Sequence, residues 1–392
     1  MKNKQFIYLL TLLLLFASHF LWYKEWKYNY SFDYSLIIFP LLAIYIYIQR
    51  GKFHNTSTTF KAVIPTLIVS HLLCGITKVV NGESFYDERF YIVCTFAFLL
   101  YYLYTARSMT ESDVLKPILI VGTITAIILI LQVLFPDYAV FGIRTEEVEG
   151  VEDIASQRNG IYRFRLSVQP ISLFCMLWSF DRYRKDRKLK KLLLFLFFTT
   201  SVYLHLTRQT IFAAVVTISC SFFFLRNTKI KLWMLLFVSI ALTLIYSFAS
   251  VLFGDMLLIS AEYDDTIRLM AVQYYWEQIC TDPLTFIFGN GHMRYLDDFQ
   301  KSSNLYASDI GIIGEWFYYG IIWIGIYVYI VFLLLHKYKN QLPLYIKLFV
   351  FATLLTSVLM YPFANTYEYI IWAGILYISH IYISGNKELI SE

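Results

Sequence analysis

The chain has 392 residues, of which 58% are hydrophobic and only 16% are charged, with a formal net charge of +5. Soluble globular domains carry about 45–50% apolar and about 25% charged residues, so this composition excludes an ordinary soluble protein and indicates an integral membrane protein. The 33 tyrosines and 34 phenylalanines are enough for aromatic belts at both membrane interfaces and for stacking on a ligand.

The apolar segments predict about twelve transmembrane helices, since a spanning helix needs roughly 20 mainly apolar residues. The segments that fit are residues 6–23, 35–49, 60–80, 90–105, 115–135, 166–180, 192–206, 209–225, 231–252, 310–335, 344–361 and 367–384. We interpret the first as a span and not as a signal peptide, because no small-residue cleavage site follows MKNKQFIYLLTLLLLF. The predicted fold class is therefore an all-α integral membrane protein, with residues 1–392 in a single polytopic domain.

Lysine and arginine collect in alternate loops and so predict the sidedness of the chain. The basic loops are RGKFHNTSTTFK, ARSMTESDVLK, DRYRKDRKLKK, RNTKIK and HKYKN. Because positive side chains favour the cytoplasmic side, these loops and both termini are predicted to be cytoplasmic. Residues 136–165 and 253–309 then form two long loops on the outer side.

Arg208 stands alone in the apolar run YLHLTRQTIFAA, and no other Lys, Arg, Asp or Glu occurs from Leu192 to Leu225. A guanidinium in the bilayer core costs at least about 2.5–3.5 kcal/mol. One helix across these residues would be about 51 Å long, against a hydrocarbon core of about 30 Å. It would also place the basic stretches 181–191 and 226–231 on opposite sides. We therefore expect a tight helical hairpin with LTRQ at its tip and Arg208 at the outer mouth.

The outer loop 253–309 contains a predicted amphipathic helix. Its apolar positions recur at helical spacing and are Leu269, Val272, Trp276 and Ile279. The sequence TDP at 281–283 ends this helix, and FGNG at 288–291 supplies a glycine turn. Such a helix lies along the membrane surface or covers a cavity.

Arginine is unusually frequent in the predicted outer segments, at positions 144, 158, 163, 165, 208, 268 and 294. The planar guanidinium binds phosphate through two parallel hydrogen bonds and keeps its proton. Several arginines around one outer cavity would therefore suit a diphosphate. The alternatives are that each arginine pairs with a loop carboxylate, or that Arg163 and Arg165 extend to the membrane interface.

Two carboxylates stand where the chain re-enters the membrane in SDIGIIGEWFYYGIIW, namely Asp309 and Glu315. A carboxylate beside an apolar wall has a raised pKa and can act as a general base. Asp309 could equally be the N-cap of the following helix, and the choice of base stays open between Asp309, Glu315 and a loop acid.

The sequence lacks the motifs of several other chemistries. It has no GxxxxGK[ST] loop, no HExxH or CxxC pair and no DxD in the first outer loop. A metal site, a nucleotide cofactor and nucleic-acid binding are therefore not expected.

Four motifs resemble, in order and sidedness, the bacterial O-antigen polymerases and ligases. They are NGIYRFR, LTRQT, IRLMAVQYYWEQICTDPLTFIFGNG and SDIGIIGEWFYYGII, spread over about residues 115–335. The resemblance implies a metal-independent glycosyltransferase of the bacterial inner membrane whose active site faces the periplasm. Its donor would be an oligosaccharide linked to undecaprenyl diphosphate, and its partners a flippase and a chain-length regulator.

The resemblance also implies roles for particular residues. By position, Arg208 and Arg268 would hold the leaving diphosphate, and Arg163 or Arg165 would assist. Counting back from the glycine at 320 puts Asp309 in the place of the ligases' histidine, which favours a repeat-unit polymerase with Asp309 as base.

Outer aromatic residues could stack on sugar rings, and the candidates are Tyr162, Trp276 and Tyr295. Two alternatives to the polymerase stay open: a ligase that transfers the glycan to lipid A core, and a flippase or transporter of surface polysaccharide such as capsule or lipopolysaccharide. Paired halves and ionisable residues clustered at mid-membrane would mark a transporter, and the sequence suggests neither.

Overall fold

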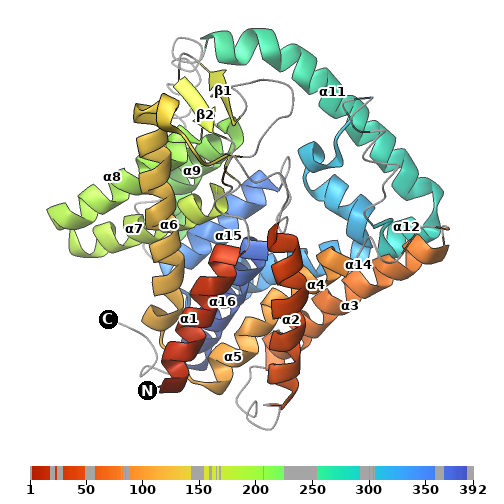
Figure 1. The fold of residues 1–392 in the computed structure, drawn as a ribbon, viewed down its shortest axis with the longest axis horizontal. Coiled ribbons are helices and arrows are strands. Elements are labelled where there is room, and N and C mark those ends of the chain that lie inside the picture. The colour runs from red at the N-terminus through yellow and green to blue at the C-terminus, as the bar shows by residue number, and fades with distance from the viewer. Residues whose placement is uncertain are drawn as a thin grey trace.

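The computed structural model describes residues 2–17, 23, 30–48, 58–80, 82, 84, 89–142, 154–158, 161–164, 166, 169–205, 207–224, 254–291, 300, 303, 305–357 and 366–385. This part of the chain is mostly helical and includes one two-stranded sheet (Figure 1). The helices of its first third are α1 (Lys2–Ala17), α2 (Tyr30–Ile48), α3 (Thr58–Val80), α4 (Arg89–Thr95), the 3-10 turn η3 (Phe96–Leu99), α5 (Leu100–Ala106) and α6 (Glu111–Leu134).

The elements that follow are η4 (Pro136–Tyr138), β1 (Ala155–Arg158), β2 (Ile161–Phe164), α7 (Gln169–Asp186), α8 (Leu189–Leu204), α9 (Arg208–Cys220) and η6 (Ser221–Phe224). The last are α11 (Gly254–Thr281), α12 (Pro283–Phe288), η7 (Ala307–Ile310), α14 (Ile312–Phe332), the π-helix η8 (Leu333–Lys337), α15 (Leu344–Thr356) and α16 (Thr366–Ser384). Helices occupy most of every predicted span except 231–252, which lies outside the described residues.

Three described helices are long and apolar enough to cross a membrane, over Ala62–Val80, Glu111–Leu134 and Ile312–Lys337. Shorter apolar helices cover Lys4–Phe16, Ile37–Ile48, Ile92–Ala106, Gln209–Cys220 and Leu344–Thr356. These helices fit an integral membrane protein. The number of twelve spans, the cytoplasmic termini and the sidedness of the loops stay predictions.

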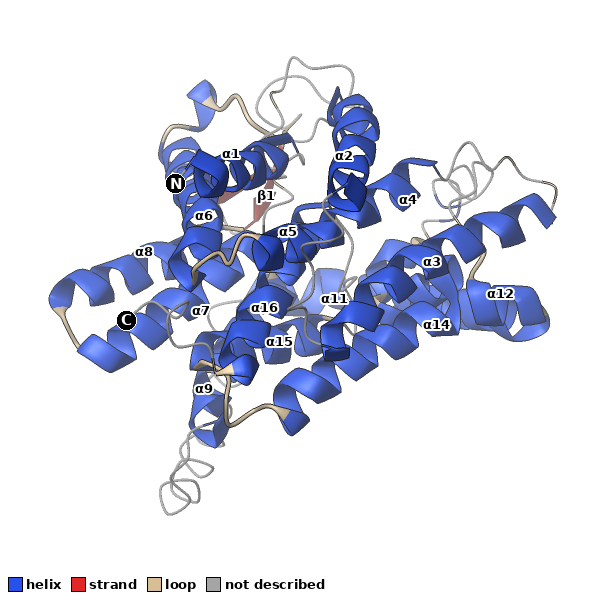
Figure 2. Ribbon diagram, turned by 90° about the horizontal axis from the view of Figure 1, so that it is seen from below, coloured by secondary structure: helices blue, strands red, loops and turns tan. Residues whose placement is uncertain are grey.

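The core of the bundle is formed around α16, which is buried along nearly its whole length. Figure 2 shows α16 in the middle of the bundle, with α5, α7 and α15 around it. A helix that is apolar on every side is stable only when other helices enclose it. Large side chains such as Trp372 and Tyr377 fill this centre.

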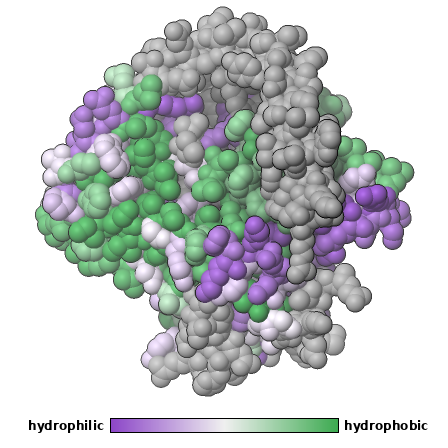
Figure 3. Space-filling model, turned by 180° about the vertical axis from the view of Figure 1, so that it is seen from behind, coloured by the Kyte–Doolittle hydropathy of each residue, from purple (hydrophilic) through white to green (hydrophobic). Residues whose placement is uncertain are grey.

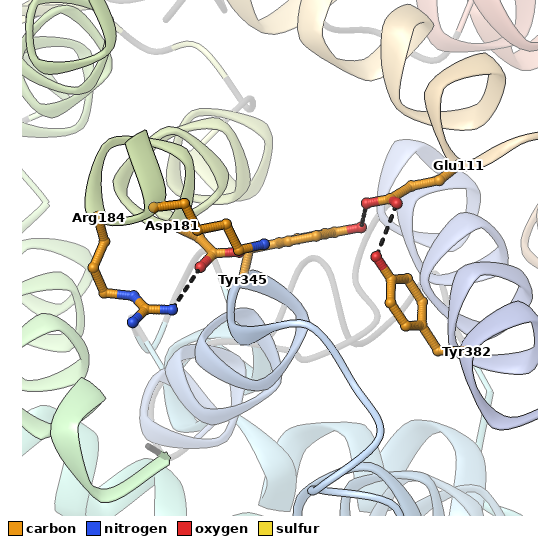
Figure 4. Close-up of polar contacts among 6 residues, drawn as sticks. Glu111, Asp181, Arg184, Tyr345 and Tyr382 are labelled. Atoms are coloured by element: carbon orange, nitrogen blue, oxygen red, sulfur yellow. Dashed lines mark hydrogen bonds and ion pairs between the residues drawn. The ribbon is translucent and has the colours of Figure 1, made fainter. Parts of the chain in front are cut away.

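A buried polar contact joins three helices at one end of the bundle. Glu111, the first residue of α6, is 2% exposed. It accepts hydrogen bonds from the hydroxyls of Tyr345 in α15 at 2.9 Å and Tyr382 in α16 at 3.0 Å (Figure 4). Asp181 of α7 lies on the other side of Tyr345 and pairs with Arg184. Two loops predicted to share the cytoplasmic side, 106–114 and 181–191, thus lie at the same end.

The predicted tight hairpin of the 192–225 run is wrong in its packing. The helix does break within the predicted tip, because α8 ends at Leu204 and α9 begins at Arg208. However, α8 packs mainly along α7, whereas α9 packs along α15. Figure 2 shows α9 running away from α8. The positive-inside pattern located the break but carries no information on helix partners.

The loop 136–165 contains a β-hairpin that an all-α prediction omits. Strands β1 and β2 pair antiparallel, with Ala155 opposite Phe164 and Arg158 opposite Ile161. The register leaves two residues between the strands, and these are Asn159 and Gly160. An Asn-Gly pair between two short strands is a strong hairpin signal, so the sequence did contain this information.

The helix predicted in 253–309 is present as α11, which ends at Thr281 as predicted, but its apolar side chains do not gather on one face. Of the four apolar positions named from the sequence, Ile279 is buried and Val272 is half-buried. Ala271, Tyr275 and Ile279, spaced four residues apart, are buried, whereas Leu269 and Trp276 are exposed. Periodicity alone did not distinguish the face that packs on protein from an exposed apolar face.

Candidate functional site

Several polar side chains converge at the chain turn between α8 and α9, and we call them the turn site. They come from β2, the first turns of α7, the end of α8 and the start of α9, with β2 close to α9 in Figure 1. The described side chains of the turn site are Arg163, Gln169, Ser172, Ser201, His205, Thr207, Gln209 and Thr210.

Arg163 reaches from β2 to the turn itself. Its Nε donates to the carbonyl oxygen of His205 at 3.1 Å, and its Nη2 donates to Oγ1 of Thr207 at 3.4 Å. His205 is the C-cap of α8, and a cation is favourable beside the unsatisfied carbonyls of a helix C-terminus. Thr207 immediately precedes Arg208. The structure therefore brings Arg163 next to the backbone of Arg208, two residues that the sequence separates by 45 positions.

The imidazole of His205 is buried in a row of hydroxyl groups. Its Nε2 lies 3.1 Å from Oγ of Ser172, which in turn lies 3.2 Å from Oγ of Ser201. The His205 side chain is 1% exposed, and its Nδ1 has no hydrogen-bond partner among the described residues. A buried polar atom without a hydrogen-bond partner destabilises the folded state. The position of this nitrogen therefore favours a functional role for the turn site over a purely structural one.

The start of α9 and the start of α14 meet at the end of α15. Nε2 of Gln209 donates to the carbonyl oxygen of Thr356 at 2.5 Å. The backbone N–H of Ile312 donates to the next carbonyl, that of Ser357, at 2.8 Å. Asp309 lies three residues before Ile312. The turn site and Asp309 are therefore held at the same end of the same helix.

Asp309 is exposed on η7 and lies outside the helix that follows. The N-cap of α14 is Gly311, with φ +53°, and it makes no side-chain capping bond. The alternative that Asp309 is simply this N-cap is therefore wrong. Oγ of Ser308 donates to Oδ1 of Asp309 at 3.5 Å. An exposed carboxylate at the end of the bundle is accessible to a substrate.

Glu315, the other candidate base, has a different environment. Its side chain is fully buried in α14, and its Oε2 accepts a hydrogen bond from Nε1 of Trp323 at 3.1 Å. His71 of α3 is also fully buried, stacked on Tyr319 with ring centres 4.2 Å apart and in edge contact with Trp323 at 4.4 Å. Both nitrogens of His71 lack a hydrogen-bond partner among the described residues. Two buried ionisable groups thus flank Trp323 inside candidate spans, which the sequence analysis did not anticipate.

The predicted FGNG turn inserts into a break in α14. Gly320 has φ +77° and ψ 175°, so the helix is interrupted there. The freed carbonyls of Phe317 and Tyr318 accept hydrogen bonds from the N–H groups of Asn290 at 2.7 Å and Gly291 at 2.9 Å. Irregular backbone within a membrane helix is tolerated where protein satisfies its polar groups, and here the turn does so.

The α11–α12 arm is fixed to α14 by further contacts. The buried amide of Gln300 donates to the hydroxyls of Tyr275 at 2.9 Å and Tyr318 at 3.0 Å. Burial raises the pKa of Tyr275 to about 12.

Asp282 caps α12 by accepting from the N–H groups of Leu284 and Thr285 and from the Thr285 hydroxyl. These hydrogen bonds, the hydroxyl bond above all, lower the pKa of Asp282.

The structure describes the side chains of three further predicted site residues and leaves out those of three others. Arg268 and Trp276 lie on α11, and α11 packs against η7, the turn that carries Asp309. Trp276 meets Trp316 edge to face at 5.5 Å. Tyr162 lies half-buried on β2 with its ring 6.5 Å from that of Phe164. Arg165, Tyr295 and the side chain of Arg208 lie outside what the structure describes.

Sequence reasoning missed the polar partners that complete the turn site, above all Ser172, Ser201 and His205. The one available signal was their polarity inside otherwise apolar segments. Within the described residues, no group of three or more His, Cys, Asp or Glu side chains could hold a metal ion. The chain matches no known protein family, no curated protein and no solved structure.

Proposed function

We infer that the protein is a glycosyltransferase that polymerises lipid-linked oligosaccharide repeat units. The observation that carries the proposal is the pairing at the end of α15, where Gln209 and Ile312 bind consecutive carbonyl oxygens. This pairing holds the arginine-bearing turn near the exposed carboxylate of Asp309. A cation site for a diphosphate and a base for a hydroxyl are the two parts that this transfer needs.

In the proposed reaction, a hydroxyl at the non-reducing end of one lipid-linked repeat unit attacks the anomeric carbon of the growing glycan. The new C–O bond forms while the bond from that carbon to undecaprenyl diphosphate breaks. The proton of the hydroxyl passes to the carboxylate of Asp309. The leaving diphosphate takes the electron pair, and Arg208, Arg268 and Arg163 stabilise its charge.

The test is to substitute Arg208→Ala and Arg268→Ala in the producing cell and to measure the length of its surface polysaccharide. We expect single repeat units on the surface. Unattached lipid-linked chains would indicate a ligase instead. Arg107→Ala is the matched control, since Arg107 contacts Tyr45 at the α5–α6 turn, far along the chain from either site. Normal long chains in both variants would refute the arginine site.

A transporter is the second candidate, and one observation favours it. Discontinuous helices with buried ionisable residues are typical of transport sites, and α14 is interrupted at Gly320 close to His71 and Glu315. Repeat units trapped on the inner face of the membrane in His71→Phe and Glu315→Gln cells would support transport over polymerisation.

A further inference from the structure

The turn between α7 and α8 carries the densest positive charge of the described chain. Its basic residues, which we call the basic tip, are Arg182, Arg184, Lys185, Arg187, Lys188, Lys190 and Lys191. Only two acids accompany them. Asp181 is 1% exposed and is occupied by Lys185 at 3.0 Å and Arg184 at 3.4 Å. The outermost cations, Arg187, Lys188 and Lys190, are exposed.

A second basic turn, which contains Lys337 and Lys339, joins α14 to α15. Helix α15 packs along α7, the helix that leads to the basic tip. Figure 3 shows a hydrophilic area at the right-hand end of the molecule, the side on which the α7–α8 hairpin projects.

An exposed apolar stripe on α8 begins at the basic tip. Leu189, Leu193 and Leu196 recur at helical spacing and are 70%, 56% and 49% exposed. The guanidinium of Arg182 lies 5.7 Å from the ring centre of Trp178, one turn before the tip on α7. Tryptophan beside a cation is typical of the headgroup level of a membrane.

We propose that the basic tip and the leucine stripe form a binding site for anionic phospholipids of the surrounding bilayer. The phosphate headgroup lies against the exposed cations, and an acyl chain lies along the leucines of α8. Charge complementarity selects the anionic headgroup, since each cation near an anionic surface contributes attraction. The stripe selects a lipid over a free phosphate or an acidic protein segment, because only the lipid joins an anion to a long apolar chain.

The test uses the purified full-length chain in a neutral detergent, incubated with phosphatidylglycerol and phosphatidylcholine of identical acyl chains. Native mass spectrometry then counts the retained lipids. We expect the wild type to retain phosphatidylglycerol about tenfold better. The variant R187Q/K188Q/K190Q/K191Q should lose this preference, whereas R187K/K188R/K190R/K191R should keep it. The variant L189Q/L193Q/L196Q should retain less of both lipids.

Three results would overturn the proposal. One is equal retention of the two lipids by the wild type, and another is an unchanged preference in the glutamine variant. The third is release of the bound lipid by an excess of glycerol phosphate, which would indicate a site for the free anion. Circular dichroism and the thermal transition of each variant establish that it folds. Should the glutamine variant fail to fold, the leucine variant and the glycerol phosphate competition still decide the matter.

Discussion

Arg163 binds the end of a helix that begins 26 residues later in the chain, with its Nε 3.1 Å from the carbonyl oxygen of His205. The same guanidinium reaches Oγ1 of Thr207 at 3.4 Å. The contact therefore joins the β-hairpin of one predicted outer loop to the turn that precedes Arg208. Since two separate nitrogens are used, the planar fork of arginine matters as well as its charge.

Two substitutions of Arg163 should accordingly distinguish the effect of its positive charge from the effect of its planar guanidinium. Arg163→Lys keeps the charge but replaces the planar fork with a single nitrogen on a flexible chain, and Arg163→Gln removes the charge. We expect the half-buried hydrogen bonds to contribute about 1–3 kcal/mol to the free energy of unfolding. The thermal transition in detergent should fall in both variants, further in Arg163→Gln. Polysaccharide chains should shorten in both. A lysine variant with wild-type chain length would exclude a role for the fork geometry.

The position of the α8–α9 turn could be predicted from sequence, whereas the partners of that turn could not. Basic stretches on both flanks required a break near Arg208, because charge distribution across a membrane acts on each segment separately. The contacts of Arg163, Ser172 and Gln209 depend on which helices become neighbours. That choice is made by side-chain packing over the whole bundle, and one sequence contains no direct signal of it.

The break in α14 gives a sharp comparison between two glycines of one helix. A Cβ atom at Gly320 would collide with the backbone of Ile287 and lie 2.6 Å from the nitrogen of Gly289, and φ there is +77°. A Cβ at Gly325 would meet nothing within 4 Å. We expect Gly320→Ala to lower the free energy of unfolding by about 2 kcal/mol or more.

Gly325→Ala is the matched control and should raise stability slightly, by roughly 0.5–1 kcal/mol, because alanine favours the helix. Thermal unfolding of both purified variants in the same detergent measures the difference. Equal transitions in the two variants would mean that the FGNG turn does not dock into α14 as described.

The sequence predicts the FGNG turn itself but not the segment on which it docks. Its glycines correctly predicted a turn at 288–291, since Gly289 and Gly291 both have positive φ. The sequence predicts ordinary helix for the segment on which this turn docks, because GEWFYYGIIW is apolar apart from Glu315 and a single glycine is tolerated within a membrane helix. Only the tertiary contact shows that Gly320 interrupts α14.

The hydroxyls of Tyr345 and Tyr382 both donate to the carboxylate of Glu111 and should stabilise the fold through it (Figure 4). Hydrogen bonds to a buried charged group contribute about 1.5–3 kcal/mol each. Tyr345→Phe and Tyr382→Phe should each lower the thermal transition, and their effects should be non-additive in a double-mutant cycle with Glu111→Gln. Tyr329→Phe, on the exposed face of α14, is the control. Strict additivity would contradict a shared carboxylate.

Acidification should loosen α12 through Asp282. Its pKa is lowered below the usual 3.8, mainly by the hydrogen bond from the Thr285 hydroxyl. A carboxyl group whose pKa is depressed by folding stabilises the folded state fully above its unfolded pKa, and this stabilisation is lost as the pH falls through the folded pKa. Amide exchange over residues 284–288 should therefore show weaker protection once the pH falls below about 4, after correction for the intrinsic exchange rate.

Two substitutions at this cap separate its charge from its geometry. Asp282→Ala should lower the stability of α12 by about 0.5–2 kcal/mol at neutral pH, whereas asparagine is an equally good N-cap. Asp282→Asn should therefore keep protection at neutral pH and lose its dependence on acid, because the amide does not titrate. The same acid dependence in the asparagine variant would assign the effect to another group. With that control, the amide exchange of residues 284–288 reports on the single carboxylate that begins the helix leading to the FGNG turn.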